Sequence, residues 1–243
     1  MCEIFFVFGK EELDKKFIRD FLETIVESGA PQSNPHGYGA MWETGSTKEP
    51  VMFQKHHISK VLKRYQPSKF FAFHVRYATS TVCYENTHPF TFKIGREVVL
   101  RGIHNGVISN MGNYKVADSY VLFKRITEKL KEHGDIVEAI QQVMKKANGT
   151  YSVVLHSIQD GKLYYFRNTP SFNMIKYGNL VFGATRISRL FPLFHFVKER
   201  DIFPPFYYHK PIPCKIYELD LDSFSISIVG EIEEKKERRW YVE

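Results

Sequence analysis

The sequence predicts an α+β fold, because strand patterns open and close the chain and two consecutive helical patterns lie between them. Aromatic residues make up 15% of the 243 residues, with 21 Phe and 14 Tyr, and they favour β-rich layers with thick side-chain packing. The sequence contains no repeat, linker or low-complexity segment. We therefore expect residues 1–243 to form a single domain. A chain of this length can bury enough apolar surface to form a stable core.

The first half of the chain opens on an apolar run, CEIFFVF at 2–8, which predicts a buried strand. Apolar residues then recur at helical spacing and predict a helix over 11–27, which Gly29 and Pro31 bring to an end. The next expected elements are a strand within 36–43, a short helix at 56–65, a strand at 70–79 and a hairpin across 90–109.

The second half begins with two predicted helices, at 118–133 and 135–147, and Asp135 is expected to be the N-cap of the second. Beyond them, Asp160-Gly161 is a strong signal for a hairpin turn. The remaining expected elements are a short helix near 187–196 and strands at 151–158, 162–167, 173–177, 180–185, 214–220 and 224–232.

Charge and cysteine content indicate the surroundings of the protein. The formal net charge is +7, but the basic residues are scattered, and their one dense cluster, at 234–239, has acidic neighbours. We therefore do not expect a nucleic-acid partner, although a weak attraction to RNA or anionic ligands stays open. Three unevenly spaced cysteines predict no disulfide framework and favour a reducing, cytoplasmic setting. Neither a membrane-spanning apolar run nor a secretory signal is present, so no membrane partner is expected.

Polar residues accumulate where the predicted strands end, and each has a structural explanation of its own. Cys2 could be a buried inert thiol, Arg76 an ion-paired residue, Asn105-Gly106 a tight turn and Asp118 a helix N-cap. Histidines are numerous, but no HExxH or CxxC spacing occurs, so we expect neither a metal nor another cofactor. Taken singly, these residues indicate no function.

Taken in order, the same residues belong to six motifs: MC at 1–2, HGYGAMWE at 36–43, FHVRYATST at 73–81, NTHPF at 86–90, IHNGVISN at 103–110 and DSYVLF at 118–123. The set resembles the class II glutamine amidotransferases, whose nucleophile is an N-terminal cysteine. NTHPF and HVRYAT look most like the short stand-alone members. The resemblance implies the four-layer αββα sandwich of the Ntn-hydrolase superfamily. The chain looks too short for an added synthase domain, so ammonia would go to a separate synthase subunit or acceptor, or simply be released.

The resemblance implies catalytic roles for Cys2, Asn105 and Gly106. Removal of Met1 would give Cys2 an α-amine with a pKa of roughly 7.7–8, which suits a base at neutral pH. This amine would take the thiol proton, and Cys2 would attack the side-chain amide of glutamine. Water would then hydrolyse the γ-glutamyl thioester. The Asn105 side-chain amide and the Gly106 N–H would bind the oxyanion.

The resemblance also implies how the rest of glutamine is bound. Arg76 would hold the α-carboxylate through its planar fork, Thr79 would add a hydroxyl, and Asp118 would hold the α-ammonium. His88 and His74 would have supporting roles as wall or strand residues.

Three positions depart from the family pattern: Glu3 stands where arginine is usual, Thr81 where glycine is common, and Tyr120 where an acidic residue is usual. None removes a catalytic group, but together they leave the γ-glutamyl substrate open. Two alternatives therefore stand beside a glutaminase. One is an amidase for a γ-glutamylated metabolite, and the other is a non-catalytic binding or regulatory protein, which a retained Met1 would favour.

Overall fold

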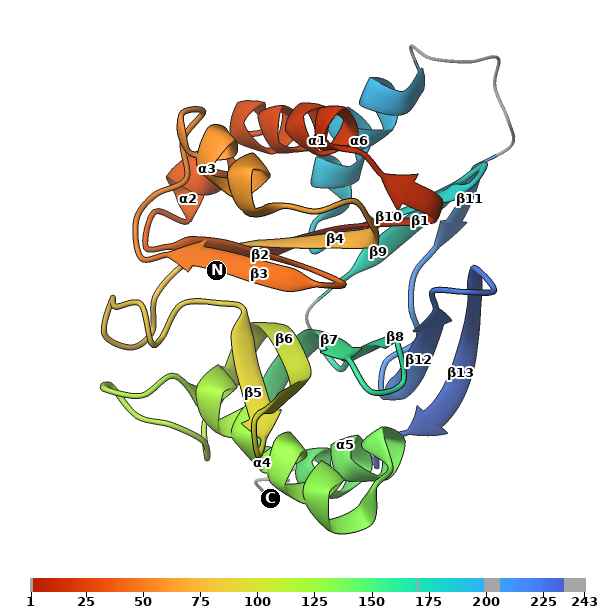
Figure 1. Cartoon of the computed structure of the whole chain (residues 1–243). Helices are drawn as coiled ribbons and strands as arrows, with labels where there is room; N and C mark the ends of the chain where they lie inside the picture. The colour runs from red at the N-terminus through yellow and green to blue at the C-terminus, as the bar shows by residue number, and fades with distance from the viewer. Residues whose placement is uncertain (1, 170, 199–205, 234–243) are drawn as a thin grey trace, which may run out of the picture.

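The computed structural model describes residues 2–169, 171–198 and 206–233. Two antiparallel sheets pack face to face, and helices cover the outer face of each (Figure 1). This arrangement confirms the expected α+β fold with four αββα layers. Met1 and the basic cluster at 234–239 lie outside the described residues.

The first sheet carries the start of the chain near its centre. Its strand order is β11-β9-β10-β1-β4-β2-β3, so β1 pairs with β10 on one side and with β4 on the other. The strands are β1 (Glu3–Leu13), β2 (Tyr38–Trp42), β3 (Gly45–Glu49), β4 (Ser68–Val75), β9 (Asn173–Tyr177), β10 (Leu180–Ala184) and β11 (Phe206–His209). The helices on this side are α1 (Lys15–Glu27), α2 (Ala30–Ser33), α3 (His57–Arg64) and α6 (Ile187–Lys198).

The second sheet has the order β13-β12-β8-β7-β6-β5. Its strands are β5 (Phe90–Ile94), β6 (Glu97–Ile108), β7 (Gly149–Ser157), β8 (Lys162–Arg167), β12 (Lys215–Asp220) and β13 (Ser225–Glu231). Helices α4 (Asp118–His133) and α5 (Ile136–Met144) cover its outer face. A Cβ atom at Gly102 would lie 2.2 Å from the Phe123 ring, so this glycine lets α4 pack closely on β6.

Several boundaries differ from the sequence predictions. Strand β1 continues to Leu13, so the helix predicted over 11–27 begins only at Lys15, after Asp14 has capped it by accepting a 2.6 Å hydrogen bond from the Phe17 N–H. Strands β3 and β11 were not expected. The N-cap role of Asp135 is confirmed, since its carboxylate accepts a 2.8 Å hydrogen bond from the Glu138 N–H.

The alternation of β1 decides where the first residues point. Phe5 and Val7 belong to the core between this sheet and its helices, whereas Ile4, Phe6 and Phe8 belong to the core between the two sheets. Successive side chains of a strand point to opposite faces. Glu3 therefore points into the helical layer, and Cys2 is directed toward the second sheet.

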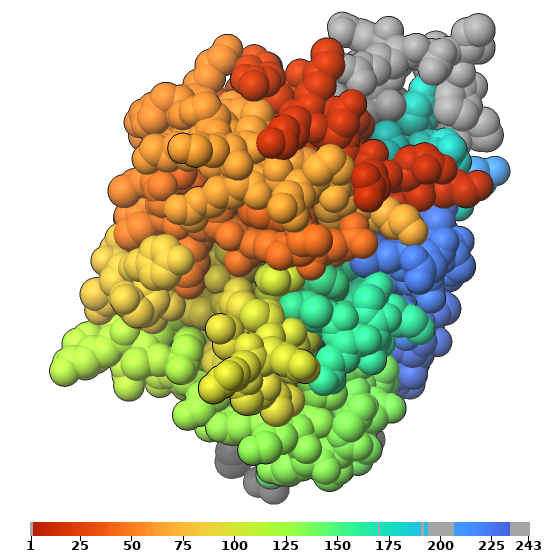
Figure 2. Space-filling model, viewed as in Figure 1, coloured from red at the N-terminus to blue at the C-terminus, as the bar shows by residue number. Residues whose placement is uncertain are grey.

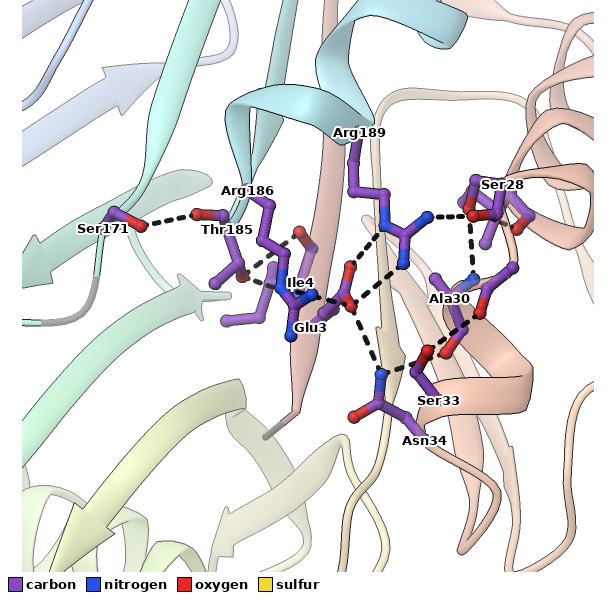
Figure 3. Close-up of polar contacts among 12 residues, drawn as sticks. Glu3, Ile4, Ser28, Ala30, Ser33, Asn34, Ser171, Thr185, Arg186 and Arg189 are labelled. Carbon is purple, nitrogen blue, oxygen red and sulfur yellow. Dashed lines mark hydrogen bonds and ion pairs between the residues drawn. The ribbon is translucent and has the colours of Figure 1, made fainter.

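Glu3 is 1% exposed and lies in a polar network that holds the start of β1 (Figure 3). Its carboxylate pairs with Arg189 at 3.1 Å and with Arg186 at 3.5 Å, and it accepts a 3.4 Å hydrogen bond from the Asn34 side-chain amide. The Ile4 N–H donates a 2.9 Å hydrogen bond to the Thr185 hydroxyl. The start of β1 is thereby tied to the segment where α6 begins.

This network makes a prediction about stability. We expect Glu3→Gln to lower the free energy of unfolding by roughly 2–3 kcal/mol, because it removes buried, charge-assisted hydrogen bonds. The control is Arg186→Gln, which removes a partner whose side chain is 50% exposed and should cost less than about 1 kcal/mol. Urea denaturation at neutral pH measures both values, and equal losses would contradict the anchoring role of Glu3.

Candidate active site

Residues from both sheets meet at one end of the space between them. Cys2 immediately precedes β1 and Arg76 immediately follows β4, and since Glu3 pairs with Val75 the two lie side by side. Asn105 lies on β6 of the second sheet, and Asp118 is the first residue of α4. The charges of Arg76 and Asp118 both act on the Cys2 thiol, so the structure brings Cys2, Arg76 and Asp118 together. Asn105 lies on the same face of β6 as Ile103, which belongs to the core between the sheets.

The Cys2 side chain is half-buried and lies against the backbone of Tyr77. Its sulfur accepts a 3.2 Å hydrogen bond from the Tyr77 N–H, and the thiol donates one of 3.4 Å to the Tyr77 carbonyl. Burial raises the pKa of the Cys2 thiol, while the Tyr77 N–H and the charge of Arg76 act in the opposite direction. Because the net shift is upward, a nucleophilic attack by Cys2 at neutral pH requires a base.

Arg76 is 3% exposed and is held on one side only. Its Nη2 donates hydrogen bonds to the Ser80 hydroxyl at 2.9 Å, to the Ser80 carbonyl at 3.2 Å and to the Thr81 carbonyl at 3.3 Å. Its Nη1 is buried and has no hydrogen-bond partner among the described residues. The guanidinium is therefore oriented by one nitrogen and can bind an anion through the other.

Asn105 and Gly106 are part of β6 and pair with Ser152 and Tyr151 of β7, so the alternative of a tight turn is wrong. Asn105 is completely buried, and neither its amide nitrogen nor its amide oxygen has a partner among the described residues. Gly106 has a φ of +144°, and a Cβ atom there would lie 2.1 Å from the Thr150 carbonyl oxygen. An amide that is buried without hydrogen-bond partners lowers the free energy of unfolding. Buried polar groups of this kind are typical of sites that bind a ligand.

The Asp118 carboxylate joins the end of β6 to the start of α4. One oxygen accepts a 2.7 Å hydrogen bond from the Ile108 N–H, and the other accepts one of 2.8 Å from the Ser119 N–H. The Ser119 hydroxyl also lies 2.8 Å from Nδ1 of the buried His104. The N-cap of α4 is Ala117, so the alternative of Asp118 as N-cap is wrong. Its carboxylate is half-buried at the helix N-terminus, where negative charge is stabilised.

His74 and His88 form a buried pair beside these residues, with ring centroids 4.2 Å apart. Among the described residues, none of their ring nitrogens has a hydrogen-bond partner. Burial lowers the pKa of His74 to about 3 and holds the pKa of His88 well below its usual value. Both imidazoles are therefore neutral at neutral pH. Thr79, the remaining predicted binding residue, is exposed in the loop after β4.

The HGYG motif supports the backbone around Arg76 and His88. The Arg76 N–H donates a 2.8 Å hydrogen bond to the Gly37 carbonyl, and the Arg76 carbonyl accepts one of 3.0 Å from the His36 N–H. A Cβ atom at Gly39 would lie 2.0 Å from the His88 carbonyl oxygen. The motif is thus a close-fitting backbone support for the NTHPF segment.

The sequence did not predict the roles of three residues. Tyr77 contacts the Cys2 sulfur, Ser80 accepts a hydrogen bond from Arg76, and Asn86 binds the loop before α4. All three residues lie inside the quoted motifs, which was the one signal available. Their partners are chosen by tertiary structure.

No group of three or more His, Cys, Asp and Glu side chains in the described part of the chain is placed to hold a metal ion. No helix in the described ranges has the length and apolar character to cross a membrane.

The buried imidazoles predict acid sensitivity. His74 stays neutral in the folded protein down to about pH 3, whereas in the unfolded chain it takes up a proton near pH 6.5. Its contribution to stability is therefore fully present above pH 6.5 and is lost as the pH falls toward 3, by about 1.4 kcal/mol per pH unit. His74→Gln should reduce the slope of unfolding free energy against pH by about this amount between roughly pH 6 and 4. Urea denaturation over this range checks it, and an unchanged slope would show that His74 is not buried as a neutral ring.

Comparison with known proteins gives matches in fold. No protein-family model and no curated protein matches the sequence. A glutamine phosphoribosylpyrophosphate amidotransferase from B. subtilis matches with a TM-score of 0.66 and 17% identity, over 94% of this chain and 49% of that one. An allosteric regulatory enzyme of purine biosynthesis matches with a TM-score of 0.67 and 17% identity, over 94% and 48%.

A shorter structure matches along its whole length. It is a glutamine aminotransferase class-II domain protein from Silicibacter pomeroyi, with a TM-score of 0.52 and 15% identity, over 96% of this chain and 100% of that one. The present chain thus spans about half of the first two structures and all of the third. At these identities the likeness concerns the fold. The chain has the four-layer fold of these structures, as its motifs led us to expect.

Proposed function

We propose that this chain hydrolyses the side-chain amide of glutamine, or of a related γ-glutamyl compound, with Cys2 as nucleophile after removal of Met1. The observation that carries the proposal concerns four groups: Arg76 and Asp118 lie within electrostatic range of the Cys2 thiol, and Asn105 lies on the same face of β6 as Ile103, in the core between the sheets. The four groups are a thiol, a buried amide without partners, a guanidinium with one unpartnered nitrogen, and a carboxylate. An amino acid with a side-chain amide has a matching group for each: the amide for the thiol and for Asn105, the α-carboxylate for the guanidinium, and the α-ammonium for the carboxylate.

In this proposal the α-amine of Cys2 is the base. Its pKa of roughly 7.7–8 would let it accept a proton at neutral pH and return it to the departing ammonia. A base is needed because burial raises the pKa of the thiol. The Tyr77 N–H would keep the sulfur in place during the attack, since it donates to that sulfur at 3.2 Å.

The tetrahedral oxyanion would be bound by the side-chain amide of Asn105 and the backbone N–H of Gly106. The buried, unpartnered state of Asn105 supports this role, because such a donor needs no reorganisation. One donor of this kind typically lowers the barrier by about 3–4 kcal/mol. Collapse of the intermediate would release ammonia and leave a γ-glutamyl thioester on Cys2, which water then hydrolyses.

The α-carboxylate of the substrate would bind Nη1 of Arg76, and the α-ammonium would bind Asp118. Both Asp118 oxygens already accept backbone N–H bonds, which fix the carboxylate while leaving further lone pairs for an ammonium. Thr79 would contribute its hydroxyl to the carboxylate, and His88 would serve as a wall. Opposite charges at fixed positions would favour a zwitterion.

We further propose that the domain covers residues 1–243, or 2–243 once Met1 has been removed. The ammonia would go to a separate acceptor or synthase subunit.

A second candidate is an amidase for a γ-glutamylated metabolite. Three tyrosines on the loops beside the site favour it, since Tyr77, Tyr84 and Tyr114 are 47%, 54% and 71% exposed. Exposed aromatic rings could contact a group attached to the γ-amide. Ammonia or amine release from a panel of γ-glutamyl amides, with glutamine included, decides between the two.

Replacing the nucleophile tests the mechanism. Cys2→Ala should lower amide hydrolysis by roughly 10⁴-fold, because no other group can form the thioester. The melting temperature should change little, and Cys83→Ala should keep its activity. An intact mass of the wild type reports whether Met1 is absent. Near-normal turnover by Cys2→Ala would overturn the mechanism, and a protein that retains Met1 and releases no ammonia would favour a non-catalytic role.

Replacing Asp118 tests the binding of the α-ammonium. Asp118→Asn should raise KM for glutamine by about thirtyfold, which corresponds to the loss of about 2 kcal/mol from a charge-assisted hydrogen bond. Glutaramate, which keeps the amide and a carboxylate but lacks the ammonium, is the matched substrate. The variant and the wild type should hydrolyse it at similar rates, and an equal loss with both substrates would assign Asp118 a purely structural role.

A further inference from the structure

One buried side chain, Asn86, joins the loop that begins at Arg76 to the loop that ends just before Asp118. The loops are residues 76–86, after β4, and residues 110–117, before α4, and they lie next to each other at one edge of the molecule, coloured gold and light green (Figure 2). Asn86 is 3% exposed. It precedes the His88-Pro89 pair of the NTHPF motif and has no role in the mechanism proposed above.

The amide of Asn86 uses both its donor and its acceptor sides. Its Nδ2 donates hydrogen bonds to the Thr81 carbonyl at 3.1 Å and to the Lys115 carbonyl at 2.8 Å. Its Oδ1 accepts one of 2.8 Å from the Ala117 N–H. One side chain therefore holds both loops at a fixed separation, and its burial keeps water from competing for these bonds.

Both ends of this bridge reach the proposed binding residues. The Thr81 carbonyl also accepts a 3.3 Å hydrogen bond from Arg76 Nη2. At the other end, Ala117 is the N-cap of α4 and directly precedes Asp118. An unbroken path of hydrogen bonds and one peptide link thus runs from the guanidinium to the carboxylate.

A second contact joins the same loops without reaching the two charges as directly. The Thr81 N–H and hydroxyl both donate to the Tyr114 carbonyl, at 2.8 Å and 2.9 Å. Removal of the Asn86 amide would therefore leave the loops tethered while releasing Arg76 and the start of α4 from each other.

We propose that Asn86 is a positioning residue that sets the distance between the Arg76 guanidinium and the Asp118 carboxylate. It would thereby select ligands that carry a carboxylate and an ammonium on one carbon. The inference rests on the proposed function, in which these two groups bind the substrate zwitterion. A displacement of about 1 Å in such a pair can cost up to a hundredfold in productive binding.

The test compares two reagents that alkylate Cys2. 6-Diazo-5-oxonorleucine carries the α-carboxylate and α-ammonium, and iodoacetamide carries neither charge. Asn86→Ala should slow labelling of Cys2 by the zwitterionic reagent on the order of tenfold to a hundredfold, while the iodoacetamide rate stays within about twofold. Asn86→Asp keeps the acceptor for the Ala117 N–H and loses both donors, so it should show the same selective loss. Peptide mass spectrometry measures all rates.

Asn110→Ala is the matched control. Asn110 also bridges two segments through both sides of its amide, donating to the Lys146 carbonyl and accepting from the Asn148 N–H, each at 2.8 Å. It does not touch the loop of Arg76, so both labelling rates should stay near the wild-type values. The inference would be overturned if Asn86→Ala slowed Cys2 labelling by both reagents equally, or if it slowed labelling by neither.

Hydrogen exchange gives a readout that needs no substrate. Asn86→Ala should speed amide exchange in residues 76–86 and 113–118 together, whereas Asn110→Ala should leave 76–86 unchanged. If amide exchange in both loops is the same in Asn86→Ala as in the wild type, Asn86 does not hold the loops together, whatever the labelling shows. A wild-type protein whose Cys2 does not prefer the zwitterionic reagent contradicts the proposed function instead, and the bridge is then decided by exchange alone.

Discussion

The buried carboxylate of Glu3 is the constraint on which the geometry of the site depends. It is held among Arg189, Arg186 and the Asn34 amide in the layer of helices, and it fixes which face of β1 each side chain occupies. Because side chains alternate along a strand, the neighbouring Cys2 is then directed between the sheets. A shift of one residue in the pairing of β1 would send the thiol into the helical layer. The acidic residue at position 3 therefore has its cationic partners on the side away from the candidate site.

The two sheets contribute different chemistry. The first sheet carries Cys2 and Arg76, and the second carries Asn105, with Asp118 on the helix packed against it. Neither sheet alone assembles the four groups. The core between the sheets, which includes Ile4, Phe6 and Ile103, therefore determines the distance between Cys2 and Asn105 as well as stability. This explains why unpartnered polar groups are tolerated there, since the surrounding packing holds them in place.

The sequence predicted the fold class because the order and alternation of its apolar segments are strong signals, as in residues 2–8 and 70–79. It missed β3, whose residues GSTKE are short and polar and form a strand only because they pair with β2 at the sheet edge. It missed β11 because that strand lies in a proline-rich connection. The motifs indicated the residues of the site. They could not indicate that Asn105 lies unpartnered or that Asn86 joins two loops, because those properties depend on residues distant in sequence.

Gly39 shows how the site limits change in the protein over evolutionary time. The atom that its Cβ would meet is the main-chain oxygen of His88, at 2.0 Å, and no substitution at position 88 removes that oxygen. A second mutation therefore cannot make room for a larger residue at 39, as it could if the neighbour were a side chain. Only a new path for the whole NTHPF segment would relieve the clash, and that path also carries Asn86. A larger residue at position 39 is thus excluded by the path of a backbone and not by the choice of any side chain.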